Sequence, residues 1–386
     1  EPFGVQYLFT EHCRDQRDNL PAPICDVKAE AAEGGVRFRY LPGTPTELRM
    51  QEGEKGLTIV EGGRDLDTIW LCDCEDVAVR NIVVRRGCGM GVIAQTSKNI
   101  EIDRFSTDPS HYDASFSLTA DALHFVNCNG FLNVHNCEIS HAMDDAINVH
   151  GIYTELKSSE SSALHVCLKH HEQKGVNVYR AGDKLWLIDP TTMRIVSEFL
   201  VSDASFEGDG VTELRIAGAF LSGVEDAIPG CFVENFERMP DVHIWKNRFD
   251  HVPNLRVSGG GALLIEDNEM KCCHSALTAF DLAQFWFESG RIHHLIFRRN
   301  HMENCNALGG KAFIHVCVSG FAENDTPKIH DCIEIYDNDF SKITKQAVRA
   351  SGVRNLILRD NRVKGSQLFP VMIDGNMDSS EQIGIC

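Results

Sequence analysis

The sequence lacks three features that would assign it to other classes of protein. No apolar run approaches the roughly 18 residues of a membrane-spanning helix, so no membrane span is expected. Basic residues are outnumbered, since 37 Lys and Arg face 56 Asp and Glu, and the formal charge of −19 disfavours nucleic acid as a partner. The 15 cysteines include no Cys-x-x-Cys pair, which removes the usual zinc-knuckle and dithiol spacings. We expect most of them to be small buried side chains rather than a disulfide framework.

What the sequence does have is a recurring eight-residue pattern, apolar-x-apolar-x-x-Asn-x-apolar. Alternation with a period of two predicts half-buried strands, and Asn tolerates the left-handed backbone of a tight bend. The copies begin at irregular distances, which favours one strand per coil with loops of variable length on one side. We therefore predict a right-handed parallel β-helix; a β-sandwich is the alternative, although repeated octapeptides with drifting loops are unusual there. The copies with the asparagine contain Asn247, Asn268, Asn300, Asn338 and Asn361, and earlier copies without it begin at Val77, Ile100 and Leu132.

The repeat is interrupted between about Tyr153 and Glu237. Short alternating runs at 184–188, 194–196 and 213–216 are separated there by turn residues, which predicts a small antiparallel β module. The predicted organisation is an N-terminal set of coils over 1–152 that carries an acidic site and that we expect to be truncated. The inserted module covers 153–237, and the C-terminal coils cover 238–386. The position of the module makes it an expected wall of a cleft. The His170-His171 pair within it is expected on the surface, since no metal spacing links it to other ligands.

Two segments in the first part, 120–126 and 144–150, read as the same strand written twice. Their Asp-Ala-apolar cores lie 24 residues apart, which is close to one coil. If the coils stack, Asp121 and Asp145 are neighbours about 4.8 Å apart, and Asp144 adds a third carboxylate. Because like charges repel, we expect one proton to be retained above the normal pKa of an aspartate, which sets an acid beside a base.

The direction in which these side chains point follows from the cost of burying charge. Strict alternation would send Asp121 and Asp145 inward, where unpaired carboxylates are very costly. We infer that the chain bends just before each Ala-apolar run and turns the aspartates onto the outer surface, with His124, Asn148 and His150 along the same strip. The alternative is a polar ladder that caps the sheet edge, but three carboxylates with no expected Arg or Lys beside them are hard to justify structurally.

Several chemistries are open to such a patch. Two carboxylates beside a glycosidic bond can hydrolyse it, one donating a proton and the other activating water. A calcium site is the competitor, and a calcium-dependent lyase would need a basic side chain such as Arg85, Arg86 or Arg256, which no pattern places there. In the segment 281–290, Trp286 followed by Glu288 near a glycine turn suits sugar recognition; alternatively, Trp286 is part of the core and Glu288 is solvated.

The runs at 89–95, 120–128, 144–151 and 286–290 together resemble glycoside hydrolase family 110. These are bacterial exo-acting α-1,3-galactosidases that remove terminal galactose, including that of the blood group B antigen. The resemblance runs from about Trp70 to the C-terminal end of the chain. It implies a parallel β-helix with small β-barrel insertions, an inverting mechanism, no cofactor or metal, terminal α-galactosyl glycans as the ligand, and a secreted, periplasmic or cell-surface location.

The resemblance also implies roles for individual residues. The aspartates of the family fall on Asp121, Asp144 and Asp145. By analogy with polygalacturonases, whose site layout is similar, Asp144 is the general acid, and Asp121 and Asp145 hold the attacking water. The candidate substrate-binding residues are His124, Asn148, His150, Trp286 and Glu288. Two alternative functions stay open at this point: a non-catalytic glycan-binding β-helix, and an endo-acting polysaccharide hydrolase or lyase on the same scaffold.

Overall fold

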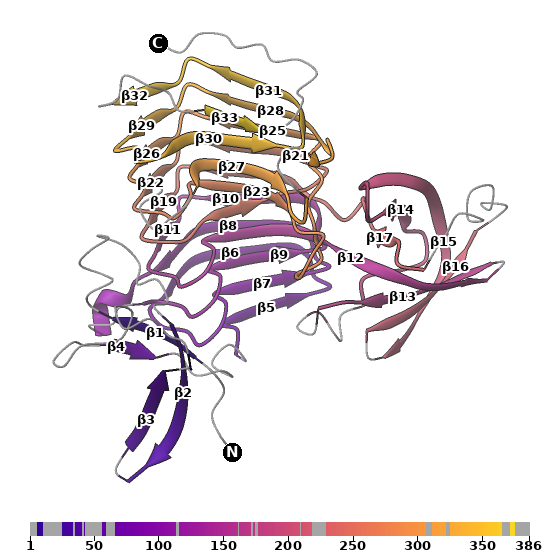
Figure 1. Cartoon of the computed structure of the whole chain (residues 1–386), viewed down its shortest axis with the longest axis horizontal. Helices are drawn as coiled ribbons and strands as arrows, with labels where there is room; N and C mark the ends of the chain where they lie inside the picture. Colours follow the sequence, from indigo (N-terminus) through magenta and orange to yellow (C-terminus); the bar gives the residue numbers. More distant parts are fainter. Residues whose placement is uncertain are drawn as a thin grey trace.

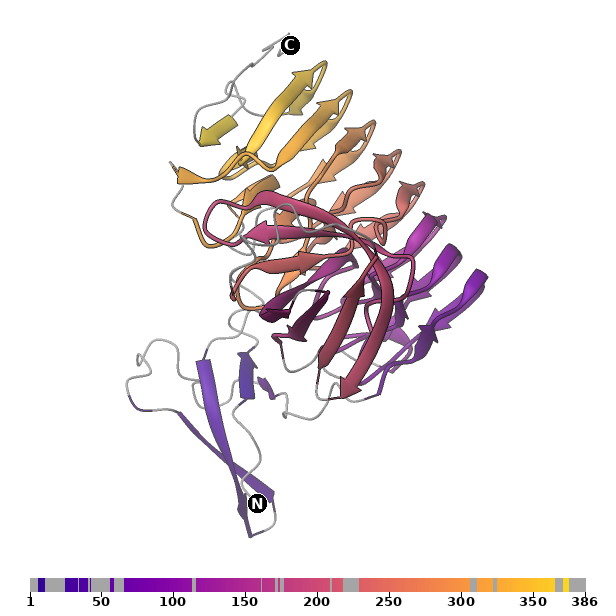
Figure 2. The same cartoon turned by 90° about the vertical axis from the view of Figure 1, so that its right-hand side faces the viewer.

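The computed structural model is a stack of parallel β-strands with a smaller β module projecting from its side (Figures 1 and 2). It describes residues 6–10, 25–33, 35–40, 42, 56–58, 66–112, 116–160, 162–170, 173, 177–208, 210–217, 229–305, 311–321, 325–364 and 371–374. His171 and both ends of the chain, including Glu1 and Cys386, lie outside the described residues.

One face of the stack, which we call sheet I, contains a strand from each coil. All neighbouring pairs in this sheet are parallel. In spatial order its strands are β5 (Ile69–Cys72), β7 (Val92–Gln95), β9 (Leu123–Val126), β12 (Ile147–Glu160), β20 (Leu255–Val257), β23 (Leu277–Asp281), β27 (Ala312–Val318), β30 (Gln346–Ser351) and β33 (Val371–Asp374).

Two further rows of strands complete the coils. Sheet II contains β6 (Glu75–Val84), β8 (Lys98–Thr107), β10 (Asn129–His135), β18 (Asp241–Trp245), β21 (Ala262–Glu266), β25 (His294–Arg298), β28 (His330–Tyr336) and β31 (Val353–Arg359). Sheet III is a row of short strands: β11 (Glu138–Ser140), β19 (Arg248–Asp250), β22 (Glu269–Lys271), β26 (His301–Glu303), β29 (Asp339–Ser341) and β32 (Arg362–Lys364). Strand β8 is long enough to pair with both β10 and β11, so it joins the two rows.

The core of the stack is made by columns of apolar side chains in register. Val134 lies opposite Ile244, and Ile244 opposite Ile265, and all three are fully buried. The same alternation in each coil therefore fills the interior with like side chains from coil to coil, which is how a solenoid buries apolar surface that one coil alone would expose. The predicted parallel β-helix is confirmed.

The asparagines of the repeat form a buried ladder at the bend between sheets II and III. Asn247 donates its backbone N–H and its Nδ2 to Oδ1 of Asn268, each at 3.0 Å, and the same pair of bonds recurs in each later coil. This Asn ladder comprises Asn247, Asn268, Asn300, Asn338 and Asn361. The left-handed residue of each bend is the one before the asparagine, such as Lys246 at φ 55°, so our placement of that backbone state on the Asn itself is wrong.

The inserted module is a closed antiparallel barrel. Its strands are the outer half of β12, β13 (Ala163–Leu168), β14 (Lys184–Asp189), β15 (Arg194–Gly208), β16 (Val211–Ile216) and β17 (Phe232–Glu234). The pairing order is β12, β13, β16, β15, β14, β17 and back to β12, so no strand of the ring is left as an edge. The barrel-like module is confirmed, whereas the boundaries at 152/153 and 237/238 stay predictions; β12 runs through the first of them without a break.

The strands between residues 6 and 58 depart from the expected coils. Strands β1 (Gln6–Thr10), β2 (Cys25–Ala32), β3 (Gly35–Tyr40) and β4 (Gly56–Thr58) pair antiparallel in a sheet of their own. The range predicted for the N-terminal coils, 1–152, stays a prediction, and within it the parallel strands begin at β5. The twelve cysteines classified in the described residues are all free. No helix described there is long and apolar enough to cross a membrane, and η2 (Pro109–Tyr112) is a 3-10 helix of four residues.

Candidate active site

A pocket of about 820 Å³, its open mouth included, lies on sheet I where β7, β9, β12 and β20 meet the module and the segment 282–290. All eight residues singled out from the sequence line it: Asp121, His124, Asp144, Asp145, Asn148, His150, Trp286 and Glu288. Met90, Ile93, Gln95, Val126, Ile152, His170, Gln173 and Arg256 complete the lining. Their roles stay predictions, but the structure does bring all eight together.

The strand register explains why the aspartates meet. Leu123 lies opposite Ile147 and His124 opposite Asn148, so the two matching segments stack as expected. Asp121 and Asp145 each come two residues before their strand, where the chain has not yet entered the alternation. The backbone N–H of Asp145 donates to Asp121 Oδ1 at 3.2 Å. One carboxylate oxygen from each of Asp121, Asp144 and Asp145 lies within 4.8 Å of the others, which would also permit a bound cation.

The surroundings of the aspartates differ from our expectation in two ways. Asp121 and Asp145 are only 5% and 4% exposed, because the module and the segment 282–290 cover this face of sheet I. They are turned out of the coil interior as expected, but they line a covered pocket on the outside of sheet I. A basic partner is also present, since Arg256 Nε donates to Asp145 Oδ2 at 3.0 Å. Arg85 and Arg86 do not line the pocket; they lie at a separate hollow with residues 82–84.

Asp145 is held from both sides. Asn254 Nδ2 donates to its Oδ1 at 2.7 Å, while Arg256 occupies its Oδ2. Burial raises the pKa of Asp145, Arg256 opposes this, and the charges of Asp121 and Asp144 add to the increase. Asp144 is the most exposed of the three, so its carboxyl group is the best placed to meet a ligand entering from the mouth.

A chain of hydrogen bonds leads from Asp121 along the pocket wall. His150 Nδ1 donates to the carbonyl of Gly151 at 2.7 Å, and burial lowers the pKa of His150 to about 4, so its Nε2 is an acceptor at neutral pH. His124 Nε2, 3.1 Å away, must therefore donate. The 2.7 Å contact between His124 Nδ1 and Asp121 Oδ2 then needs a further proton, which these two groups share.

Glu288 is the second buried carboxylate that Arg256 contacts. Arg256 Nη1 lies 3.5 Å from Glu288 Oε2, so the guanidinium bridges Glu288 and Asp145. Burial raises the pKa of Glu288, but the charges around it, with Arg256 among them, outweigh burial and leave that pKa below its usual value. The alternative in which Glu288 is solvated is wrong, because its side chain is 11% exposed.

The mouth of the pocket is aromatic. The ring of His170 lies 4.4 Å from that of Trp286, centroid to centroid, and Gln173 Nε2 donates to the carbonyl of Trp286 at 2.8 Å. Trp286 is partly exposed rather than a core residue, and His170 is buried rather than on the surface as we expected. Deeper in the pocket, Oδ1 of the buried Asn148 has no hydrogen-bond partner among the described residues, which marks it as a group that a ligand can satisfy.

The chain is similar over most of its length to bacterial proteins named α-1,3-galactosidases. It is 26% identical to alpha-1,3-galactosidase A of Bacteroides fragilis, over 90% of this chain and 57% of that protein. With alpha-1,3-galactosidase A of Shewanella woodyi the identity is 26%, over 92% and 57%, and with alpha-1,3-galactosidase B of Bacteroides thetaiotaomicron it is 27%, over 88% and 53%. The predicted resemblance is confirmed.

Two further comparisons are less informative. The chain spans little more than half the length of these α-1,3-galactosidases, and no protein-family model matches it. Among solved structures it is similar to the family 28 exopolygalacturonase of Yersinia enterocolitica, with a TM-score of 0.36 and 13% identity, over 81% of this chain and 45% of that one.

Sequence reasoning missed the supporting residues of the pocket. Arg256 and Asn254 hold Asp145, yet they lie 111 and 109 residues further along the chain. A signal was available, because Leu255-Arg256-Val257 repeats the apolar-polar-apolar pattern of Ile147-Asn148-Val149 and pairs with it in register. Extending the stack by one more coil would have placed Arg256 beside Asn148.

Proposed function

We propose that this chain carries the active site of an exo-acting glycoside hydrolase that releases terminal α-1,3-linked galactose. The observation that carries the proposal is the convergence of Asp121, Asp144 and Asp145 in one pocket of a chain that is similar to α-1,3-galactosidases. A pocket lined by carboxylates and edged by Trp286 suits a single terminal sugar, whose apolar face an aromatic ring can cover. We also propose, from the resemblance, that the protein acts outside the cytoplasm.

In the proposed mechanism, Asp144 gives its proton to the glycosidic oxygen as the bond to the leaving sugar breaks. Asp121 and Asp145 hold a water molecule. The water oxygen attacks the anomeric carbon, and the water proton passes to one of these two carboxylates. His124, Asn148, His150 and Glu288 are the proposed partners of the galactose hydroxyls. The inverting outcome rests on the resemblance, because carboxylate oxygens within 4.8 Å of one another are closer than the roughly 6.5–9.5 Å usual for an inverting pair.

One assay addresses both substrate and stereochemistry. The protein is incubated with branched and linear α-1,3-galactosyl oligosaccharides, and the anomer of the first galactose released is followed by NMR, with and without a chelator. We expect β-galactose at the start of the reaction and no effect of the chelator. Initial α-galactose would refute inversion, and absence of release from every α-1,3-galactoside would refute the activity. Loss of activity in chelator would favour a cation held by the three aspartates.

A substitution tests the assignment of the acid. Asp144→Asn should lower kcat by roughly 10²–10⁴-fold, because the amide cannot give up a proton, while binding of galactose is retained. Asp267→Asn, on the exposed turn beside Arg299, is the matched control and should keep the parent's kcat. A protein that only binds glycans would show no hydrolysis even before substitution, and an Asp144→Asn variant with full turnover would remove Asp144 from the mechanism.

A further inference from the structure

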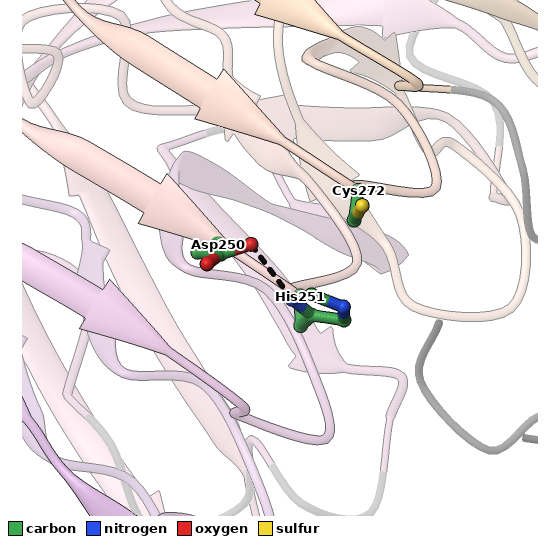
Figure 3. Close-up of side chains that lie close together, drawn as sticks. All are labelled: Asp250, His251 and Cys272. Carbon is green, nitrogen blue, oxygen red and sulfur yellow. Dashed lines mark hydrogen bonds and ion pairs between the residues drawn. The ribbon is translucent and has the colours of Figure 1, made fainter. Parts of the chain in front are cut away.

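A second cluster of potential ligands lies at the corner between sheets III and I and shares no residue with the pocket. Figure 3 shows its three side chains close together. Asp250 ends β19, and His251 follows it with a left-handed backbone, φ 53°. Cys272 follows β22 in the next coil, also at φ 53°. Because β19 and β22 are parallel with Asp250 opposite Lys271, His251 and Cys272 occupy the same corner position in neighbouring coils. Their side chains therefore stand about one strand spacing, roughly 4.8 Å, apart.

The geometry suits a shared cation. One carboxylate oxygen of Asp250, one ring nitrogen of His251 and Sγ of Cys272 lie within 4.8 Å of one another. Zinc is bound at about 2.3 Å by sulfur and at about 2.0–2.2 Å by nitrogen and oxygen, so tetrahedral ligands lie somewhat more than 3 Å apart. The atoms that lie farthest apart would need to approach by up to about 1.5 Å to reach that spacing. Asp250 Oδ1 accepts a hydrogen bond from His251 Nδ1 at 2.7 Å, so this proton must move to Nε2 for Nδ1 to bind the cation beside Asp250.

We propose that Asp250, His251 and Cys272 bind one divalent cation of the zinc class, with water in a fourth position. A thiolate, an imidazole and a carboxylate together favour zinc over calcium or magnesium, which prefer oxygen ligands alone. Binding displaces the proton of the Cys272 thiol into solvent, and Cys272 is a free cysteine. Asn304, at the same corner of the following coil, donates Nδ2 to Cys272 Sγ at 3.6 Å and so helps to orient the sulfur.

The solvent exposure of the three side chains and the residues packed around them both fit a bound cation. The side chains of Asp250 and His251 are 24% and 26% exposed, so an ion can arrive from solvent, whereas Cys272 is buried. The ring of His141, in the preceding coil, stacks on that of His251 at 5.0 Å and limits its rotation. The turn that starts at His251 continues to Asn254, which bonds Asp145. The cation would thus fix a turn that supports the pocket.

The test uses Co²⁺ as a spectroscopic substitute for Zn²⁺ on the reduced, chelator-treated full chain. A sulfur-to-cobalt charge-transfer band should grow to one equivalent per chain and be lost in Cys272→Ser. Cys332→Ser is the matched control, because Cys332 belongs to a different cluster with His294 and Glu334, and it should keep the band. His251→Gln should weaken Co²⁺ binding by roughly tenfold or more. Zn²⁺ at roughly a hundredfold excess over its Kd should raise the Tm of the parent by a few degrees.

Three results would overturn the proposal. They are the absence of a stoichiometric band in the parent, a band that survives Cys272→Ser, and a band lost in Cys332→Ser instead. If Cys272→Ser does not fold, as judged by circular dichroism, His251→Gln decides the question, since unchanged Co²⁺ affinity in that variant would exclude the site. Every measurement reads metal binding or stability, so the outcome is independent of whether the pocket cleaves galactosides.

Discussion

The Asn ladder and the acidic pocket are both polar columns that run from coil to coil, but they satisfy their polar atoms in different ways. In the ladder each inner amide donates to the asparagine of the next coil and accepts from that of the previous coil, as Asn268 does between Asn247 and Asn300. In the pocket, buried carboxylates share a single guanidinium, and Asn148 Oδ1 has no partner among the described residues. The ladder is complete without a ligand, whereas the pocket retains charge and hydrogen-bonding capacity that a ligand can use.

Among the changes that test this comparison, the largest effect is expected when the buried carboxylates of the pocket lose the guanidinium of Arg256. Arg256→Gln removes the partner of Asp145 and Glu288, so the pKa of Asp145 should rise further and less of it is ionised at neutral pH. If the proposed hydrolysis occurs, kcat/KM should fall by roughly 10²–10³-fold and its pH optimum should move upward. Arg256→Lys keeps the charge without the forked contact and should lose less. Full activity in Arg256→Gln would show that Arg256 only supports folding.

The next effect concerns the pH dependence of stability. Burial lowers the pKa of His150 to about 4 from about 6.5, so the unfolded chain binds more protons than the folded one between these values. The free energy of unfolding therefore contains a contribution from His150 that is fully present above pH 6.5. Up to about 3 kcal/mol of it is lost as the pH falls toward 4. The free energy of unfolding in urea is measured for the parent and for His150→Gln across this pH range. The values of the two proteins should converge at low pH. His293→Gln, at a side chain that is 75% exposed, should run parallel to the parent throughout.

The smallest effect is expected for a substitution in the Asn ladder. Asn268→Ala removes an amide that accepts from Asn247 and donates to the Ile244 carbonyl and to Asn300, and it leaves buried backbone groups unpaired. The free energy of unfolding should fall by about 1–3 kcal/mol, with the rate of the proposed hydrolysis per folded molecule unchanged. Asn361→Ala, in the last coil of the ladder, should cost less. A loss of activity without a loss of stability in Asn268→Ala would contradict the separation of the two columns.

Much of the fold could be predicted because each coil repeats the same short pattern of apolar and polar residues. The alternation around Asn247 and its later copies predicts strands, and their irregular spacing predicts loops on one side of a solenoid. The residue with left-handed backbone in each bend was predicted wrongly. Asparagine tolerates that backbone, but its side chain stabilises the bend more by pointing inward and making hydrogen bonds. A solvated residue such as Lys246 takes the left-handed state instead.

The aspartate part of the candidate site was predictable because its residues share one local pattern, whereas Trp286 and Glu288 were found from the segment 281–290 and the family resemblance. The Asp-Ala-apolar match aligned Asp121 with Asp145 because 24 residues separate them with no insertion between. Arg256 returns to the stack after the whole module, so sequence distance gave no guide to its position. Burial of the aspartates was missed for the same reason, because the covering comes from segments that the repeat does not contain.

Strand β12 belongs to both the stack and the barrel, which limits where the barrel can be exchanged between relatives. Its first residues pair with β9 and β20 in the stack, and its later ones pair with β13 and β17 in the barrel, with no hinge between. A graft spliced at the predicted border would cut the segment that holds Asn148 and His150 in place. Splices made farther out, near the hairpin between β12 and β13, would leave the floor of the pocket intact.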